Sequence, residues 1–555
     1  MTIKGRIVDV KTQEVYDGEI IIEGNRIERI NHCELPNLES WPYLLPGFID
    51  SHVHIESSML LPCEYARVAV THGTIGVVTD PHEIANVLGI DGIDFMIRNG
   101  RQARFNFLFS APSCVPAIGG EIETSGATIT ADDIEKLIVR DDIGYLGEMM
   151  NFPGVLAKDP EVLRKIDAAC AAGKPVDGHA PGLSLDELRQ YAAAGITTNH
   201  ECMTLDEGRN NIAAGLMVII REGSAAKSFK ALFPLLGEHP DRIMFCTDDH
   251  EPDEFTQGHI NRIVSQALAK GYSLWNVLQA ACVNPQEHYG MNWGLLQEGD
   301  PATFIAVDSL TPDFRVMRTF IQGQEVFRRP DGVTDAFSLE PDCDYATTNR
   351  FEASPISLSD IALKVKPGDM MDIISATDYA LMTGHEKTIV TEEMCSSIEY
   401  PLPDVQKIVV LNRYQQGARP VVGWVRGFAI RSGAIAGSVA HDSHNIVAIG
   451  SDDMSLVQAI NRVVALRGGR VAVSSDGIVD LPLPFAGLMS PLSAQEVATR
   501  MEQLLDTARQ IGCPMQAPFM TISFMCLPVI PELKITDRML LDTRTMTSVT
   551  TERRM

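Results

Sequence analysis

The sequence predicts an α/β protein whose main part is a closed (β/α)8, TIM-like barrel, with a small β-sandwich beside it and a separate α+β domain at the C-terminal end. Three observations support this fold class. The chain has 555 residues, 45% of them hydrophobic, so it is too long for one ordinary domain and can bury a large core. Between Leu44 and Asp249, eight short apolar runs that end in polar residues alternate with segments of helical spacing. No GxGxxG motif follows the first run, which disfavours an open doubly wound sheet.

The apolar runs are the expected strands of the barrel. They cover residues 44–50, 74–80, 106–111, 143–148, 174–179, 196–201, 216–222 and 242–249. Buried parallel strands that alternate with helices have continuous apolar sequences, and eight of them can close into a barrel. Reactive groups then lie at the carboxyl ends of the strands. We place the catalytic barrel at residues 44–291.

The two flanks of the barrel predict the small β-sandwich. Residues 5–10 and 18–27 alternate apolar and polar side chains around a turn, as strands do. Residues 299–308 and 318–326 have the same short-strand character and follow the last expected barrel helix. We therefore expect residues 1–43 and 292–335 to form one unit.

A further domain is expected at residues 340–555. Strands are predicted within 408–412, 446–450 and 470–473. An amphipathic helix is predicted after Ser493, because Ser493 and Glu496 stand in capping-box positions and an apolar stripe follows.

The charge of the chain makes some partners unexpected. Lys and Arg number 46 against 73 Asp and Glu, a formal net charge of -27. Nucleic acid and anionic membrane surfaces are bound by concentrated Lys and Arg, so we expect neither as a partner. A small neutral or cationic substrate fits better, although acidity is also a common solubility trait.

Cysteine usage and the N-terminal residues predict a cytoplasmic protein. The 11 cysteines are scattered and form no CxxC motif, which suits free thiols in a reducing compartment. The first residues lack the apolar stretch of a signal peptide, and no run reaches the length of a membrane span.

The first apolar run carries the strongest chemical signal. His52 and His54 are two residues apart on an expected strand, so both side chains point the same way and can bind one metal ion. Further candidate ligands stand at the ends of later runs, at Glu148, His179, His200 and Asp248. Four imidazoles and two carboxylates suffice for two divalent ions, with Glu148 and a hydroxide as the bridges. This ligand set suits Mn, Fe and Zn.

The pattern resembles the amidohydrolase superfamily, which has HxH after the first strand, a bridging ligand at the fourth, histidines at the fifth and sixth and an aspartate at the eighth. Many relatives bridge the metals with a carboxylated lysine. Here the position is Glu148, which weakens the case for a hydantoinase or dihydroorotase.

Other motifs resemble the bacterial type of the adenine deaminase family over nearly the whole chain. They are PGFIDSHVHIESSM (46–59), DPHEIANVLG (80–89), SCVPA (113–117), GEMM (147–150), REGSA (221–225), CTDD (246–249), HDSHN (441–445) and LPLPFAGLMS (481–490). The resemblance implies hydrolytic deamination of adenine to hypoxanthine and ammonia in purine salvage, by a metal-activated hydroxide that attacks C6. It also implies two ions per active site, Mn²⁺ with Fe²⁺ or Zn²⁺ as alternatives, and a homo-oligomer, a dimer or larger.

Two other functions stay open at this point. One is another two-metal amidohydrolase, a cyclic amide hydrolase or a deacetylase. The other is a catalytically silent barrel that serves as a scaffold, in which ligands would be missing; none is missing here.

Two residues have predicted catalytic roles. Asp248, a ligand with a free oxygen, is expected to take the proton of the hydroxide and deliver it to the departing amine. Glu148 is the candidate for protonating ring N1, although a carboxylate tied to two metals is a poor acid.

Substrate contacts are predicted at the ends of the second and seventh runs. His82 and Glu83 follow one, and Arg221 and Ser224 follow the other, so they can frame a purine or else support the ligands and loops. His441 and His444 are three residues apart. They could converge on a metal or over the barrel mouth, or be buried hydrogen-bonding residues at a domain junction, and we leave them out of the metal set.

Overall fold

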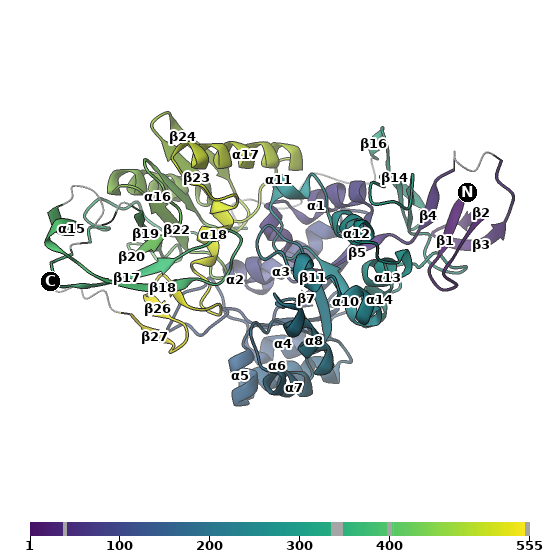
Figure 1. Ribbon diagram of the computed structural model, residues 1–555, viewed down its shortest axis with the longest axis horizontal. Coiled ribbons are helices and arrows are strands. Elements are labelled where there is room, and N and C mark those ends of the chain that lie inside the picture. Colours follow the sequence, from purple (N-terminus) through teal and green to yellow (C-terminus); the bar gives the residue numbers. More distant parts are fainter. Residues whose placement is uncertain (37–40, 335–347, 364, 397–401, 403, 550–555) are drawn as a thin grey trace.

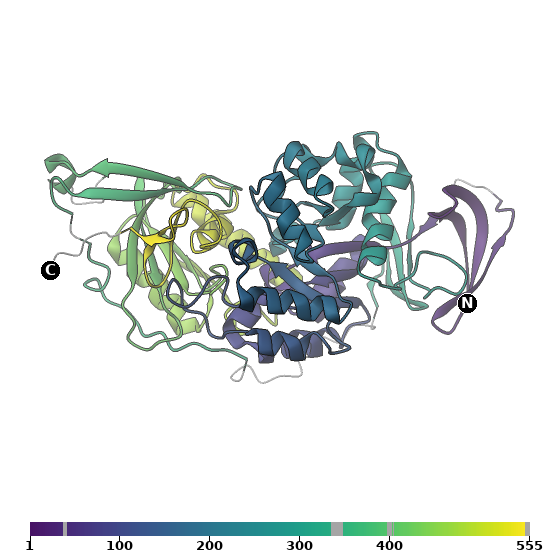
Figure 2. The same ribbon diagram turned by 90° about the horizontal axis from the view of Figure 1, so that it is seen from below.

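Three parts lie side by side along the long axis of the molecule. The computed structural model describes residues 1–36, 41–334, 348–363, 365–396, 402 and 404–549. Figure 1 shows an N-terminal sheet at one end, parallel strands surrounded by helices in the middle and the C-terminal domain at the other end. Figure 2 shows that the N-terminal strands project from the side of the middle part that faces away from the C-terminal domain.

The middle part contains eight parallel strands in chain order. One sheet holds β5 (Phe48–Val53), β6 (Thr74–Thr79), β7 (Asn106–Ala111), β8 (Tyr145–Met149) and β9 (Val176–Gly178), and a second holds β10 (Thr198–Asn199), β11 (Met217–Arg221) and β12 (Ile243–Cys246). Each lies within or overlaps one of the predicted runs. Most of these strands are buried along their whole length, as expected for parallel strands covered on both faces.

Backbone hydrogen bonds join the two parallel sheets at both ends. Thr197 N donates to Val176 O at 2.9 Å, which connects the β9 region to the β10 region. At the other end, Asp248 N donates to His52 O at 3.0 Å and His54 N donates to Asp248 O at 3.3 Å. The result is a curled parallel sheet that is consistent with a TIM-like barrel.

Helices lie between successive parallel strands and after the last of them, β12, and they cover the sheet. They are α1 (Pro62–Ala69), α2 (His82–Leu88), α3 (Ile90–Gly100), α4 (Ala131–Leu137), α5 (Phe152–Ala157), α6 (Pro160–Ala171), α7 (Leu185–Ala193), α8 (Leu205–Ala213), α9 (Phe229–Leu232), α10 (Leu235–Glu238), α11 (Pro252–Phe255), α12 (Ile260–Ala269), α13 (Leu274–Leu278) and α14 (Asn284–His288). Their buried faces pack on the strands in one continuous core.

The first predicted run, 44–50, is divided in the structure. Tyr43–Leu45 forms β4 of the N-terminal sheet, whereas the parallel sheet begins with β5 at Phe48. Pro46 has no backbone N–H for a sheet. At Gly47 a Cβ atom would lie 2.1 Å from Ile75 Cγ2, so the chain passes too close to β6 for a side chain. The Pro-Gly pair therefore marks the change from one sheet to the other.

Both flanks of the predicted barrel region contribute strands to the N-terminal sheet. Its order is β16-β15-β14-β13-β4-β1-β2-β3, with β1 (Thr2–Asp9), β2 (Glu14–Glu23), β3 (Arg26–His32), β13 (Phe304–Val307), β14 (Val316–Ile321), β15 (Gln324–Arg328) and β16 (Gly332–Val333). The link is β4, which pairs with β1 on one side and β13 on the other. Hydrogen bonds make the described strands one continuous sheet, and a sandwich arrangement stays a prediction.

The C-terminal domain is built on a second eight-stranded sheet. Its order is β18-β17-β20-β19-β22-β21-β23-β24, with β17 (Met370–Ser375), β18 (Gly384–Ile389), β19 (Val405–Leu411), β20 (Val421–Arg426), β21 (Ala434–Gly437), β22 (Ile446–Gly450), β23 (Gly469–Ser474) and β24 (Gly477–Pro482). A three-stranded sheet follows, with β25 (Leu533–Ile535), β26 (Leu540–Asp542) and β27 (Thr547–Ser548). The predicted strands at 408–412, 446–450 and 470–473 are confirmed, apart from Asn412. Residues 340–347 and 550–555 of the predicted domain lie outside the described residues.

The described residues of this domain form four α-helices: α15 (Glu392–Ser396), α16 (Asp453–Leu466), α17 (Ala494–Gln510) and α18 (Pro518–Phe524). The capping box predicted for α17 is confirmed, because the Ser493 side chain accepts from Glu496 N and the Glu496 side chain accepts from Ser493 N. Its predicted apolar stripe is buried, including Val497, Met501 and Leu504.

The C-terminal domain packs firmly against the middle part. Ala494 N, at the start of α17, donates to Glu64 Oε1 at 2.7 Å, and Ser490 N donates to Met59 O at 2.9 Å. Arg470 in β23 forms a buried ion pair with Glu251, which precedes α11. The two parts thus meet on the side of the parallel strands where the polar strand ends lie.

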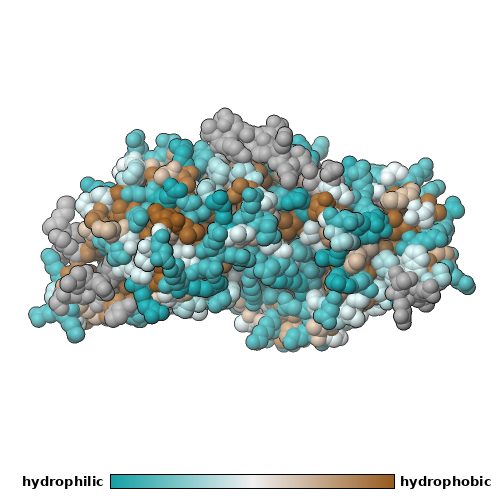
Figure 3. Space-filling view, turned by 90° about the horizontal axis from the view of Figure 1, so that it is seen from above, coloured by the Kyte–Doolittle hydropathy of each residue, from teal (hydrophilic) through white to brown (hydrophobic). Residues whose placement is uncertain are grey.

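The face of the molecule shown in Figure 3 is mostly hydrophilic, with scattered apolar patches that are largest over the C-terminal domain. This agrees with the excess of acidic residues in the chain. Within the described residues, no helix combines the length and apolar character needed to cross a bilayer.

Candidate metal centre and substrate pocket

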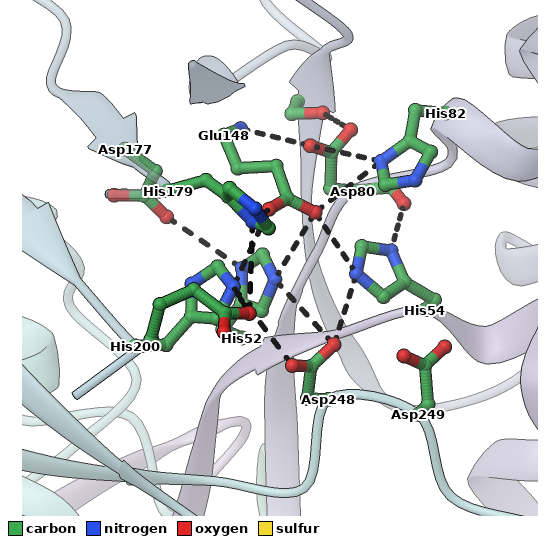
Figure 4. A network of polar contacts seen from close by, with 12 residues as sticks. His52, His54, Asp80, His82, Glu148, Asp177, His179, His200, Asp248 and Asp249 are labelled. Carbon is green, nitrogen blue, oxygen red and sulfur yellow. Dashed lines mark hydrogen bonds and ion pairs between the residues drawn. The ribbon is translucent and has the colours of Figure 1, made fainter. Parts of the chain in front are cut away.

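The six predicted metal ligands come together at one end of the parallel strands (Figure 4). His52 lies in β5, Glu148 lies in β8, and the other four ligands directly follow β5, β9 and β10 or lie two residues beyond β12. All six are buried, with at most 4% of their surface exposed. Parallel strands meet at their carboxyl ends, so residues almost 200 positions apart in the sequence become neighbours.

Glu148 lies at the centre of the cluster, and its two oxygens face different imidazoles. Oε1 is 3.2 Å from His54 Nε2 and 3.7 Å from His52 Nε2. Oε2 is 2.8 Å from His179 Nδ1 and 3.3 Å from His200 Nε2. One carboxylate therefore connects two pairs of histidines, which is the geometry that a bridging ligand needs.

Asp248 completes the group on the side of His54. Its Oδ1 is 3.1 Å from His54 Nε2, and its Oδ2 is 3.8 Å from His200 Nε2 and accepts from the Arg221 guanidinium. The Asp248 backbone has φ of 56°, in the left-handed region that non-glycine residues seldom adopt. Backbone hydrogen bonds to His52 and His54 hold it there and fix the carboxylate beside the HxH pair.

A divalent metal ion fits the donor atoms of this cluster. Among the described residues, buried nitrogens without a hydrogen-bond partner include both ring nitrogens of His52, Nε2 of His179 and Nδ1 of His200. A buried polar atom without a partner is costly, and a metal ion is a partner that imidazole accepts. Triads able to hold an ion include His52, His54 and Asp248 on one side and His52, Glu148 and His200 on the other.

The surrounding charges keep the two carboxylates ionised. Burial acts to raise the pKa of Glu148, but the His200 and His179 imidazoles outweigh it and hold that pKa well below its usual range. Burial likewise opposes ionisation of Asp248, and Arg221 and His54 hold its pKa well below the usual value. Both side chains can therefore act as anionic ligands.

Asp80, which directly follows β6, supports the backbone of Glu148 at the proposed bridging position. Its Oδ2 accepts from Glu148 N at 2.9 Å, and its Oδ1 accepts from Ser110 Oγ at 2.6 Å. His54 Nδ1 lies 3.0 Å from the Asp80 carbonyl oxygen, so the Asp80 backbone orients that ring. A Cβ atom at Gly147 would lie 2.3 Å from Asp80 Oδ2, so a glycine precedes the bridging residue for reasons of space.

Three of the four predicted substrate contacts line the cavity beside the metal ligands. His82 Nδ1 is 3.6 Å from Glu148 Oε1, and its Nε2 is 3.3 Å from Glu83 Oε1. Arg221 pairs with Asp248 and donates to Glu201 Oε1 at 2.6 Å. Ser224 is not among the residues that line this cavity in the described chain; its hydroxyl donates to Glu254 at 2.8 Å and accepts from Glu251 N at 2.9 Å.

Glu201 joins the site although the predicted residue set did not include it. Its Oε1 is 3.3 Å from His200 Nε2 and 3.6 Å from His179 Nδ1. The sequence signal was its position directly after His200 at a strand end. It connects the Arg221 guanidinium to the two histidines of the later strands.

His441 and His444 converge over the polar ends of the parallel strands. Both are also buried, hydrogen-bonding residues where two parts of the chain meet, so the structure shows two of the arrangements that their spacing left open. Both imidazoles reach Glu83: His444 Nε2 bonds to Oε2, and His441 Nε2 lies 3.2 Å from Oε1. They enter from the C-terminal domain, which adds Leu381, His441, Asp442, Phe524 and Leu527 to the cavity lining. We call these five residues the roof. Roof and strand ends enclose a cavity of about 20 Å³.

Comparison with known proteins decides the family. Residues 43–326 match the amidohydrolase family, and residues 380–547 match the adenine deaminase C-terminal domain. An adenine deaminase of Salinibacter ruber is 48% identical over 543 residues, which cover 98% of this chain and 97% of that protein. The chain belongs to the adenine deaminase family. The candidate site therefore lies between the part that matches the amidohydrolase family and the part that matches the adenine deaminase C-terminal domain.

Other adenine deaminases match over similar lengths. That of Methanosarcina barkeri is 45% identical and covers 98% of this chain and 97% of its own length. Among solved structures, N-acetyl-D-glucosamine-6-phosphate deacetylase from Mycobacterium smegmatis aligns with a TM-score of 0.46 and 17% identity, covering 59% of this chain and 99% of that chain. The latter likeness is too distant to support any argument about function.

Proposed function

We propose that this protein hydrolyses adenine to hypoxanthine and ammonia with two divalent metal ions. The observation that carries the proposal is the position of Glu148, whose two oxygens each face a pair of histidines beneath a roof of the adenine deaminase type. The relatives that match almost the whole chain are named adenine deaminases.

The residues that would hold the ions divide into two sets around Glu148. His52, His54 and Asp248 surround one position, and His179 and His200 surround the other. When bound, divalent ions in such a site lower the pKa of water and so supply a nucleophile near neutral pH. Mixed imidazole and carboxylate ligands suit Mn²⁺, Fe²⁺ and Zn²⁺ alike. We propose Mn²⁺ as the preferred ion on the family resemblance, with Fe²⁺ or Zn²⁺ as alternatives.

The protein's own groups move the protons and position the ring. During the reaction a C6–O bond forms from water, the C6–N6 bond breaks and ammonia leaves. Asp248 stays ionised and so can accept the proton of the attacking water and pass it to the departing amine. Glu148 stays the predicted candidate for protonating N1, a role for which its ionised carboxylate must first take up a proton. His82, Glu83 and Arg221 line the cavity and are the proposed substrate contacts beside these two groups. Ser224 stays a predicted contact.

The domain arrangement, the oligomeric state and the location of the protein complete the proposal. We propose that the eight parallel strands close as a barrel within residues 44–291, beside a sandwich formed by 1–43 and 292–335 and a domain at 340–555. The predicted homo-oligomer and the cytoplasmic location stay predictions. The ten cysteines among the described residues are all free, in keeping with the thiol usage of the sequence.

Adenine turnover in metal-depleted protein tests the function. We expect no activity without metal, and equal amounts of hypoxanthine and ammonia when Mn²⁺, Fe²⁺ or Zn²⁺ is returned stepwise to two ions per chain. Absence of adenine turnover with all three metals would contradict the proposal and favour a cyclic amide hydrolase or a deacetylase. Release of ammonia and hypoxanthine separates these reactions, because neither alternative forms hypoxanthine.

A further inference from the structure

The roof places a carboxyl group opposite the metal ligands, and neither the metal set nor the proposed proton transfers use it. Asp442 is 2% exposed and lines the cavity, and its Oδ2 has no hydrogen-bond partner among the described residues. Beside it, His441 Nε2 lies 3.2 Å from Glu83 and 3.4 Å from Asp249 without the alignment of a hydrogen bond. Within the part of the chain that the structure describes, Asp442 Oδ2 is thus a roof atom without a hydrogen bond, whereas His441 Nε2 is within ion-pair distance of two carboxylates.

One imidazole ring, that of His82, separates the Asp442 carboxyl group from Glu148. His82 lies between the two, with Nδ1 3.6 Å from Glu148 Oε1 and Nε2 3.8 Å from Asp442 Oδ2. A purine is an imidazole fused to a six-membered ring. When it lies alongside His82 with C6 at the metal ligands, its opposite edge reaches the roof.

The edge of adenine opposite C6 has a defined hydrogen-bonding pattern. N3 lies across the six-membered ring from C6 and is an acceptor, and the adjacent N9–H is a donor. A neutral carboxyl group offers the complementary pair, one O–H and one carbonyl oxygen. Burial, followed by the charge of Glu83, raises the pKa of Asp442 well above its usual range, which favours the neutral form.

The rest of the roof suits the faces of an aromatic ring. Phe524 stacks on His441 with 4.4 Å between ring centroids and an interplanar angle of 7°. His441 is fixed from behind by Ser523, whose Oγ lies 2.6 Å from Nδ1. Leu381 and Leu527 add apolar surface to the same wall. The cavity of about 20 Å³ has room for about one water molecule, so the roof must shift when a purine enters.

We propose that the C-terminal domain selects the substrate, with Asp442 hydrogen-bonded to N3 and N9–H of adenine and the His441–Phe524 pair forming the adjoining wall. This assignment rests on the proposed function. It makes the free base the substrate, because a substituent on N9 removes the donor and meets the roof. A site whose buried polar groups are left unpaired rejects such an analogue strongly.

Substrate analogues test the contact in the wild-type enzyme. We expect 9-methyladenine and 3-deazaadenine each to have kcat/KM about tenfold or more below that of adenine, because each removes one of the two hydrogen bonds. Equal kcat/KM for adenine and 9-methyladenine would overturn the proposal. Failure of the wild-type enzyme to deaminate adenine at all would instead contradict the proposed function.

Three variants then assign the contact to Asp442. In Asp442→Leu, KM for adenine should rise about tenfold or more with two ions still bound, and the penalty for 9-methyladenine should shrink. Asp442→Asn should restore most of the loss, since an amide offers both a donor and an acceptor. Asp537→Asn is the matched control, because Asp537 is a buried carboxyl of the same domain that accepts from Thr124 N and Asn412 and lies outside the cavity lining.

The outcomes are distinct. If the ratio of kcat/KM for adenine to that for 9-methyladenine is the same in Asp442→Leu as in the wild type, the contact does not belong to Asp442. A third bound ion that is lost in Asp442→Leu would also overturn it, because His82, Glu83 and Asp442 would then be a metal site. If Asp442→Leu fails to fold, the analogue series on the wild type and on Asp442→Asn still decides the edge that is recognised.

Discussion

Glu148 shows how one side chain organises the proposed chemistry at the residue scale. Its two oxygens face the imidazoles of the four candidate histidine ligands, and its backbone N–H donates to Asp80. A carboxylate in this position supplies charge to both metal positions at once. Loss of either oxygen should therefore affect both ions.

Glu148→Gln tests this dependence. The amide keeps the shape but loses the negative charge and one acceptor, so we expect fewer than two ions per chain at micromolar free metal and a loss of deaminase activity of about 100-fold or more. Metal content by atomic absorption is the measurement, with the exposed Glu502→Gln as control. Two ions bound with unchanged affinity in Glu148→Gln would remove the bridge from the proposed site.

The convergence of the candidate ligands could be predicted because each stands at the end of an apolar run. His52, Glu148, His179 and Asp248 needed only strand positions and the rule that strand ends of a parallel barrel converge. Glu201 was missed because a residue adjacent to a ligand can point either way at a strand end. Asp442 was missed because no local pattern reveals that a distant domain covers the mouth.

At the scale of elements, the spacing between strands decides which side chains can be tolerated. β8 passes so close to the Asp80 carboxylate that a Cβ atom at Gly147 would lie 2.6 Å from Asp80 Cγ. Asp80 in turn holds Glu148 N. Gly147 thus leaves room for the Asp80 carboxylate, and Asp80 holds the backbone of Glu148, the proposed bridging ligand.

Gly147→Ala should disturb the site without changing any ligand. The added methyl group pushes Asp80 aside, and overpacking of this kind costs about 1–3 kcal/mol. We expect a lower melting temperature together with weaker metal binding, measured by calorimetry and metal titration. Gly119→Ala is the control, since a Cβ atom there would meet nothing within 4 Å. Wild-type metal affinity in Gly147→Ala would show that Asp80 does not position Glu148.

Element boundaries were harder to predict than element types. The run 196–201 contains a strand of only two residues, Thr198–Asn199, because hydrogen bonding to the neighbours lasts no longer. The run 44–50 is shared between two sheets, because Pro46 and Gly47 interrupt it. Apolar character continues through both, so periodicity alone does not show where the hydrogen-bonding partner changes.

At the scale of the whole molecule, buried polar contacts join distant parts of the C-terminal domain behind the roof. Lys534 in β25 is fully buried, and its Nζ donates to Leu381 O at 2.8 Å and to Phe524 O at 3.0 Å. Both acceptors belong to roof residues. Burial lowers the pKa of Lys534 to about 7 from 10.5, so its amine is largely neutral in the folded protein above that pH.

The stability of the protein should therefore depend on pH through Lys534. Between pH 7 and 10.5 the unfolded chain binds a proton that the folded chain does not. Folding stability consequently rises with pH across this window, by up to ~1.4 kcal/mol per pH unit, and this gain is lost as pH falls towards 7. In Lys534→Met the rise should disappear, although overall stability falls because two carbonyl oxygens lose their donor.

Urea unfolding of the metal-loaded enzyme at pH 7, 8 and 9 measures this dependence. The difference in the free energy of unfolding between wild type and Lys534→Met should be smaller at pH 7 and larger at pH 9. Lys230→Met, at an exposed position, should keep the slope of the wild type. Parallel wild-type and Lys534→Met curves would show that Lys534 keeps its proton when the protein folds.

The candidate metal ligands and the roof residues occupy different parts of the sequence, and this affects how the substrate preference of the protein can evolve. All six metal ligands lie between His52 and Asp248, whereas the five roof residues lie between Leu381 and Leu527. Mutations in the second half of the gene can then alter which heterocycle is accepted while the hydrolytic machinery in the first half stays intact. If the roof selects the substrate as proposed, changes in the C-terminal domain could shift substrate preference without an intermediate that has lost its metals.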